Sequence, residues 1–189
     1  MITAEDYQII PTLDTDTRNV SDEFKGLPLS QIREILLGRI LPFSVLAENV
    51  QGDLNLGVML RTANAFGARE VLYHGRKRFD RRSCVGVQNY TDFHHLTPEQ
   101  LIALKDIYYI VGFENNHASS VPIQSFDWNN RGEKPILLVF GSEESGIDEQ
   151  IKAMCDGFVY IEQRGSVRSL NVSSCASIGM FLVSQALGG

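Results

Sequence analysis

The chain has 189 residues, 43% of them hydrophobic, and a formal net charge of −6 at pH 7. This length and composition predict one globular domain with a sizeable core and a short arm, and they exclude a bilayer-spanning segment because no run is long and apolar enough. The acidic balance weighs against generic nucleic-acid binding, although phosphate contacts depend on a local basic patch rather than on the total charge.

Three widely spaced cysteines argue against two further classes of protein. Cys84, Cys155 and Cys175 show neither the even count of a disulfide framework nor the spacing of a zinc site. The N-terminus lacks the charged and then apolar layout of a secretion signal. We therefore expect reduced thiols, no metal ion and a cytoplasmic location.

The first 42 residues are expected to form an arm and one short helix. Residues 1–25 are polar with little periodicity, which predicts an irregular arm that packs on the domain or on a neighbouring subunit. Apolar residues at helical spacing predict an amphipathic helix over 29–37. Pro42 ends the connection, so the main domain is expected to span 43–189.

The next stretch predicts a strand, a helix and a second strand. Residues 43–47 are a short apolar run, and residues 70–74 are another. Between them, residues 55–66 carry one apolar helical face, with Asn55 as the expected N-cap and Gly67 as the stop. Two strands joined through a helix indicate a parallel sheet.

Cationic side chains in this region allow two interpretations each. Arg61, in the middle of the apolar helix, is either a surface residue with its head in water or an anion contact in a pocket at the helix start. The loop after the second strand is either a solvated loop or a grip on a phosphate backbone. Its basic residues are Arg76, Lys77, Arg78, Arg81 and Arg82.

The second half of the chain continues to alternate strands with helices. This alternation predicts an open, mostly parallel α/β sheet flanked by helices, in which ligands lie beyond the C-terminal ends of the strands. The expected elements are a helix capped by Thr97 with Pro98 at its first position, strands over 107–113 and 135–140, a helix over 148–155 capped by Asp148, and a last strand over 157–161.

Two loops after buried strands contain candidate site residues. Gly141, directly after a strand, allows a ligand to approach the backbone, and Glu143 can bind a ribose or anchor a neighbouring loop, with a plain turn as the alternative. The last strand enters a polar loop that ends at a helix of small residues. Ser169 and Asn171 precede that helix and are residue types that cap helices.

Three stretches in series resemble the three motifs of the SpoU, or TrmH-like, branch of the SPOUT RNA methyltransferases. They are residues 55–67, 138–146 and 161–173, and the resemblance spans residue 43 to the C-terminus. Residues 76–83 also resemble the family members that 2′-O-methylate a guanosine in the tRNA D-loop. One departure follows Ile161, where this chain has Glu162-Gln163 and the family usually has Pro-Met.

The resemblance implies a fold, a cofactor and partners. The implied fold is an α/β sheet with a C-terminal deep trefoil knot, so that 43–189 is a SpoU methyltransferase domain. The implied cofactor is S-adenosylmethionine, and the implied substrate is RNA, with tRNA favoured over rRNA. Family members are homodimers with the site near the interface.

The resemblance also implies roles for individual residues. Arg61 is expected to contact the ribose 2′-hydroxyl and the substrate phosphate, as an orienting group because a guanidinium is a poor base. Ser169 is expected to hold the hydroxyl or the methionine end of the cofactor. The remaining implied roles are fixing of the loops and of Arg61 by Asn55 and Asn171, a buttress by Glu143, and an adenine pocket lined by Gly141, Ile161 and Leu170.

Two other classes of function are weighed against this one. A catalytically idle RNA-binding protein of the same fold is favoured by Glu162 and the net acidity, but the intact Asn55, Arg61, Ser169 and Asn171 oppose it. A small-molecule Rossmann enzyme requires a Gly-x-Gly-x-x-Gly turn after its first strand, which this chain lacks.

Overall fold

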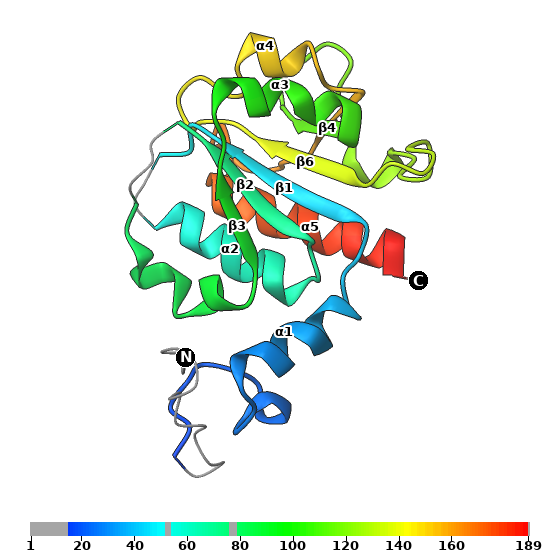
Figure 1. Cartoon of the computed structure of the whole chain (residues 1–189). Helices are drawn as coiled ribbons and strands as arrows, with labels where there is room; N and C mark the ends of the chain where they lie inside the picture. The colour runs from blue at the N-terminus through cyan, green and yellow to red at the C-terminus, as the bar shows by residue number, and fades with distance from the viewer. Residues whose placement is uncertain (1–14, 52–53, 76–78, 189) are drawn as a thin grey trace.

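The computed structural model of the chain, which describes residues 15–51, 54–75 and 79–188, contains a seven-stranded parallel sheet (Figure 1). The strand order is β3-β2-β1-β6-β4-β7-β5, and each pairing between neighbours is parallel. This confirms the predicted α/β class. The strands are β1 (Phe43–Glu48), β2 (Glu70–His74), β3 (Asp92–His95), β4 (Tyr109–Phe113), β5 (Val121–Pro122), β6 (Ile136–Phe140) and β7 (Gly157–Tyr160).

Helices cover both faces of this sheet (Figure 1). On one face lie α2 (Asn55–Ala65) and α5 (Val172–Gly188), and on the other lie α3 (Pro98–Ile107) and α4 (Glu149–Lys152). Every residue of β6 is buried, as expected for a central strand covered on both faces. Alternate side chains of the central strands therefore divide between two hydrophobic clusters, one against α2 and α5 and one against α3 and α4.

The N-terminal part packs at one end of the sheet, below it in Figure 1. It contains the short 3-10 helix η2 (Asp22–Phe24) and α1 (Leu29–Leu37), whose bounds match the predicted helix. The segment before α1 is held together by Asp16, whose carboxylate accepts hydrogen bonds from Arg18 and from the Gly26 backbone. Residues 1–14 of the predicted arm lie outside the described residues, and the domain boundary at residue 42 stays a prediction.

The helix boundaries show which local signals were sufficient. Thr97 caps α3 through a capping box with Gln100, and Asp148 caps α4, both as predicted. Because α3 continues to Ile107, β4 begins two residues later than the predicted strand. The helix α4 is also shorter than predicted.

Two strands were not predicted. The strand β3 lies at the sheet edge, and its residues alternate between exposed and half-buried, so its sequence has no apolar run. The strand β5 has only two residues at the opposite edge. Edge strands of this kind carry little of the hydrophobic signal that marks a central strand.

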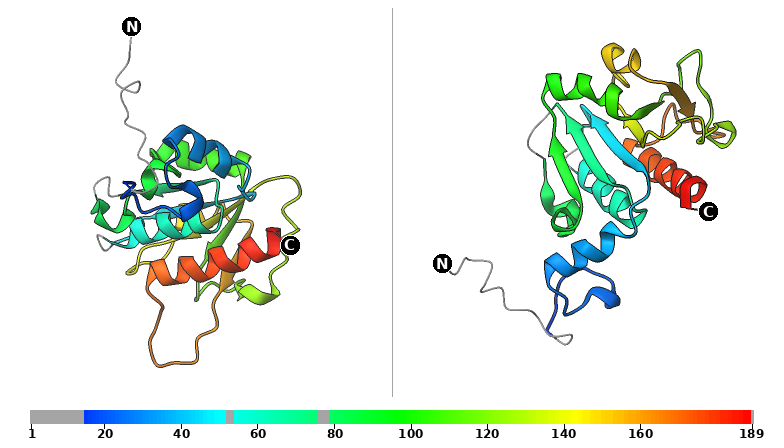
Figure 2. Two further views of the ribbon diagram at one scale, coloured as in Figure 1. Left: turned by 90° about the horizontal axis from the view of Figure 1, so that it is seen from below. Right: turned by 45° about the vertical axis from the view of Figure 1, so that its right-hand side comes forward.

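The connectivity creates a switch point next to β1. From β1 the chain adds β2 and β3 on one side, whereas β6 and β4 lie on the other. The connection from β7 to α5 extends away from the body as a long loop in the left view of Figure 2, and α5 then lies against α2. The predicted trefoil knot stays a prediction.

Candidate functional site

A cavity of about 200 Å³ lies at the carboxyl ends of β4, β6 and β7. Ligands bind at this end of the strands in open parallel sheets. The loops after these three strands and the segment before α5 supply its walls. Among the residues that line it are Glu114, Gly141, Glu143, Ile161, Gln163, Ser169, Leu170 and Cys175.

Five of the residues predicted from the sequence come together around this cavity. Gly141 and Glu143 belong to the loop after β6, Ile161 follows β7, and Ser169 and Leu170 precede α5. They are separated by up to 29 positions in the chain, yet they line one space. Their roles toward a ligand stay predictions.

A hydrogen-bonded network at the rim ties three distant stretches together. One carboxylate oxygen of Glu143 accepts from the Gln51 backbone N–H at 2.8 Å, and the other accepts from Asn55 Nδ2 at 2.6 Å. Asn55 Nδ2 also donates to the Gln51 carbonyl, and Asn55 Oδ1 accepts from Asn171 Nδ2 at 3.1 Å. The loop before α2, the loop after β6 and the start of α5 are therefore held in a fixed relation.

The two asparagines of this network have different local roles. Asn171 Oδ1 accepts from the backbone N–H groups of Ser173 and Ser174, at 2.9 and 3.2 Å, which confirms that Asn171 caps α5. The predicted capping role of Asn55 is wrong. Asn55 is the first residue of α2, Leu54 occupies the cap position without a side-chain bond, and the Asn55 amide is engaged by Glu143 and Asn171 instead.

The loop after β6 is a tight turn that requires glycine at two positions. Ser142 and Gly146 exchange two backbone hydrogen bonds, of 3.0 and 2.9 Å, and Gly146 has a φ of +72°. A Cβ atom at Gly141 would lie 2.2 Å from the Gly146 carbonyl carbon. The turn itself therefore makes the close backbone approach that Gly141 permits, and it holds Glu143 beside the cavity.

Arg61 is not one of the described residues that line this cavity. Its side chain is on the exposed side of α2 and contributes to a second cavity of about 220 Å³, together with Ser21, Cys84, Val85 and Tyr90 among others. The geometry of one chain therefore brings Asn55 to the rim of the first cavity but leaves Arg61 outside it.

The described part of the basic loop packs beside the start of α2. It forms the short 3-10 helix η3 (Arg81–Cys84), in which Asp80 accepts hydrogen bonds from the backbone and side chain of Arg82. The contact with α2 is close, because a Cβ atom at Gly57 would lie 2.0 Å from Ser83 Oγ. Both Arg81 and Arg82 are exposed there. Arg76, Lys77 and Arg78 lie outside the described residues.

Burial disfavours a thiolate nucleophile in the cavity. Cys175 lines it, but burial raises the pKa of this thiol to about 12, so the sulfur is protonated at neutral pH.

In the described ranges no group of three or more His, Cys, Asp or Glu residues is arranged to hold a metal ion. The same ranges contain no helix with the length and apolarity needed to cross a membrane.

Sequence reasoning missed several polar residues of the cavity, among them Glu114 and Gln163. Glu114 directly follows β4, as Gly141 follows β6, and its carboxylate lies 3.4 Å from the Ile147 backbone nitrogen. Its position after a buried strand was the available signal. Gln163 lines the cavity from the loop after β7, and the sequence marked it only as part of the departure from the family's usual Pro-Met, without a site role.

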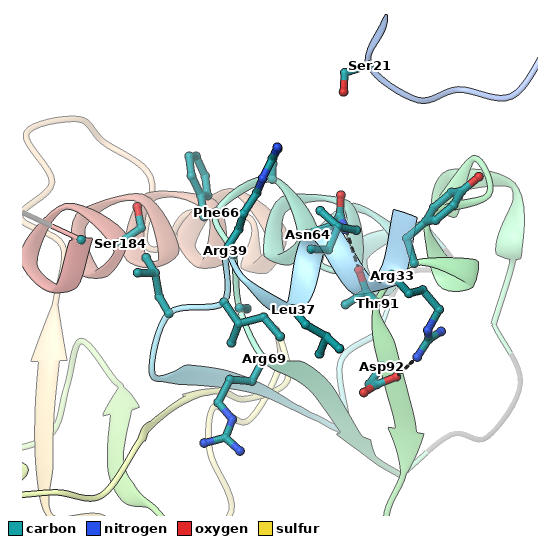
Figure 3. A pocket seen from close by; sticks show the side chains of 18 of the residues that line it. Ser21, Arg33, Leu37, Arg39, Asn64, Phe66, Arg69, Thr91, Asp92 and Ser184 are labelled. Carbon is teal, nitrogen blue, oxygen red and sulfur yellow. Dashed lines mark hydrogen bonds and ion pairs between the residues drawn. The ribbon is translucent and has the colours of Figure 1, made fainter. Parts of the chain in front are cut away.

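A larger cavity of about 660 Å³ lies at the opposite end of the strands, between α1 and the C-terminal ends of α2 and α5 (Figure 3). Two of its arginines, Arg33 and Arg39, are paired with Asp92 and Glu23. None of the predicted site residues that the structure describes lines it. We therefore take the cavity at the carboxyl ends of the strands as the candidate site.

Sequence comparison relates the chain to enzymes that modify RNA. A model of the SpoU rRNA Methylase family matches residues 42–181. The chain is 30% identical over 162 residues to a tRNA (guanosine(18)-2'-O)-methyltransferase of Thermus thermophilus, which covers 80% of this chain and 78% of the relative. It is 31% identical over 173 residues to the 23S rRNA (guanosine-2'-O-)-methyltransferase RlmB of Coxiella burnetii. This match covers 87% of this chain and 67% of that relative.

Solved structures share the fold. The SpoU methyltransferase AviRb of Streptomyces viridochromogenes, crystallised with AdoMet, matches with a TM-score of 0.68 at 23% identity, over 79% of this chain. This chain spans only 61% of AviRb. The TrmH/SpoU tRNA modifying enzyme of A. aeolicus matches with a TM-score of 0.70 at 24% identity, over 83% of this chain and 81% of that one. At these identities the likeness concerns the fold alone.

Proposed function

Because this chain belongs to the SpoU rRNA methylase family, we propose that it is an RNA methyltransferase that uses S-adenosylmethionine to methylate a ribose 2′-hydroxyl. The observation that carries the proposal is the network of Asn55, Glu143 and Asn171 at the rim of the cavity, since it joins the three motif stretches. We propose tRNA as the substrate and the cytoplasm as the location. An rRNA substrate is the second candidate, because the relatives include enzymes named for each.

The cavity residues fit the cofactor in chemistry. Gly141, Ile161 and Leu170 offer backbone groups, and Ser169 offers a hydroxyl. Gln163 adds a buried amide oxygen that has no hydrogen-bond partner among the described residues. When bound, S-adenosylmethionine supplies an activated methyl group, so the protein needs only to position the acceptor hydroxyl and assist the loss of its proton.

The residues of the chain divide this task. Arg61 orients the ribose and the adjacent phosphate, because a guanidinium is a fixed positive charge with several donors and a poor base. Ser169 hydrogen-bonds the acceptor hydroxyl or the cofactor. Glu143, Asn55 and Asn171 act through the loops that they hold, as positioning residues.

We propose further that the complete site needs two copies of the chain. In one copy Arg61 is outside the cavity, on the exposed side of α2. Beside it α5 leaves apolar side chains uncovered: Ile178 is 38% exposed, and Phe181 is 47% exposed although it packs on Phe66. An exposed apolar helix face of this kind is suited to a self-complementary contact between two copies, which would bring Arg61 of one copy toward the cavity of the other.

Phe181→Glu is expected to convert a dimer into a monomer and to abolish methyl transfer, because it buries a charge at the centre of the proposed interface. Light scattering coupled to gel filtration measures the mass. Ile102→Glu, at a residue 66% exposed on α3 across the sheet, is the matched control and should stay dimeric and active. A wild-type protein that is monomeric at working concentration would refute the interface.

The activity itself is tested by binding and then by transfer. Calorimetry with S-adenosylmethionine should show one site per chain, and labelled methyl groups should enter bulk tRNA at bonds that resist alkaline hydrolysis, because 2′-O-methylation blocks the attacking hydroxyl. Label in rRNA alone would favour the second substrate. Binding without transfer to either RNA would favour the idle RNA-binding protein, and no binding would contradict the proposal.

A further inference from the structure

Gln163 lines the candidate site, and its side chain carries an unsatisfied polar atom. Its amide oxygen is buried and has no hydrogen-bond partner among the described residues. Among the residues that the structure describes, only Gln88 and Arg131 also have a buried side-chain atom without a hydrogen-bond partner, and neither lines the cavity. Burying a carbonyl oxygen without a partner opposes folding, so its position calls for a donor that the free chain does not contain.

The lining of the cavity contains both charged and neutral side chains. Glu114, Glu143 and Arg168 are charged and suit the carboxylate and ammonium of an amino acid. Gln163 is neutral, and its amide presents an acceptor and a donor side by side. This pattern is complementary to the exocyclic amine and neighbouring ring nitrogen of adenine, an edge that glutamine binds with two hydrogen bonds.

We infer that Gln163 recognises the adenine base of the bound cofactor. Its amide oxygen accepts a hydrogen bond from the exocyclic amine, and its amide nitrogen donates to a ring nitrogen of the base. The inference rests on the proposed function, because it takes the ligand to be an adenosyl compound. It adds a side chain that selects the base to a cavity whose other contacts to the base are expected from the backbone of Gly141, Ile161 and Leu170.

The test compares two ligands that differ only at the exocyclic group of the base. S-adenosylhomocysteine carries an amine there, and S-inosylhomocysteine carries an oxygen. Calorimetry should show that the wild type binds the adenosyl compound about tenfold more tightly. Gln163→Met, which keeps the unbranched shape without hydrogen-bonding groups, should weaken binding of the adenosyl compound about tenfold and leave the inosyl compound nearly unchanged.

The controls separate this inference from the function on which it rests. Gln150→Met, at an exposed residue of α4, should behave as the wild type. A Gln163→Met protein that keeps the wild-type preference for adenine overturns the inference while leaving the proposed function intact. A wild type that binds neither compound contradicts both. If Gln163→Met does not fold, Gln163→Ala carries the same expectation, and thermal unfolding of the free protein reports folding.

Discussion

Arg61→Ala is expected to reduce methyl transfer by at least about 100-fold and to leave the affinity for S-adenosylmethionine unchanged. The split follows from position. Arg61 is not among the described residues that line the candidate cavity of its own copy, so the substitution removes no contact within that copy's cavity. What it removes is the positive charge that, by our proposal, orients the ribose and its phosphate during transfer.

Calorimetry with the cofactor and transfer to tRNA under saturating cofactor measure the two halves of this expectation. Arg69→Ala is the matched control, because Arg69 is an exposed arginine just before β2, at the opposite edge of the sheet from the candidate site. It should retain wild-type activity. Turnover by Arg61→Ala close to that of the wild type would remove Arg61 from the mechanism.

Mixed dimers test whether Arg61 acts on the cavity of the other copy. Arg61→Ala and Glu143→Ala damage different parts of the proposed site. If the two residues of one site come from different copies, a mixed dimer contains one undamaged site and one doubly damaged site. Equal mixing with free exchange should then restore about a quarter of the wild-type activity. If both residues come from the same copy, each site of the mixed dimer stays damaged and no activity returns.

The sequence predicts the central sheet well because burial leaves a strong local signal. The strands β1 and β6 are apolar runs, and the N-terminal ends of α3 and α4 are set by capping residues that act within one turn. Edge strands such as β3 lack that signal, because half of their side chains meet solvent. The fold class was therefore predictable, whereas the edges of the sheet were not.

The candidate site was predictable to the extent that strand ends determine it. Gly141 and Ile161 directly follow β6 and β7, and parallel strands end at one edge. The role of Asn55 was not predictable, because the same side-chain amide can either cap a helix or cross-link two loops. Only the position of Glu143 decides between these two roles. The position of Arg61 outside the cavity was not predictable either. A helical pattern shows which side of α2 is exposed, but it does not show which part of the molecule faces that side.

Glu143→Ala is expected to impair both cofactor binding and methyl transfer, by about tenfold and about 100-fold. Its carboxylate accepts from the Gln51 backbone and from Asn55, and Asn55 in turn accepts from Asn171. Removing the carboxylate leaves two donors unpaired and frees the loop before α2 from the loop after β6. Because Glu143 also lines the cavity, the cofactor should lose affinity, unlike in Arg61→Ala.

A second substitution at this position separates an anchoring role from a proton-accepting one. Glu143→Gln keeps an oxygen that accepts one hydrogen bond but removes the charge and the ability to take a proton. An anchor should therefore regain much of its function in Glu143→Gln, whereas a proton acceptor should be as inactive as in Glu143→Ala. Glu133→Ala, at an exposed glutamate before β6 at the opposite edge of the sheet, controls for loss of one negative charge. Wild-type binding and transfer by Glu143→Ala would show that the network does not hold the site, because the loops would then keep their geometry without it.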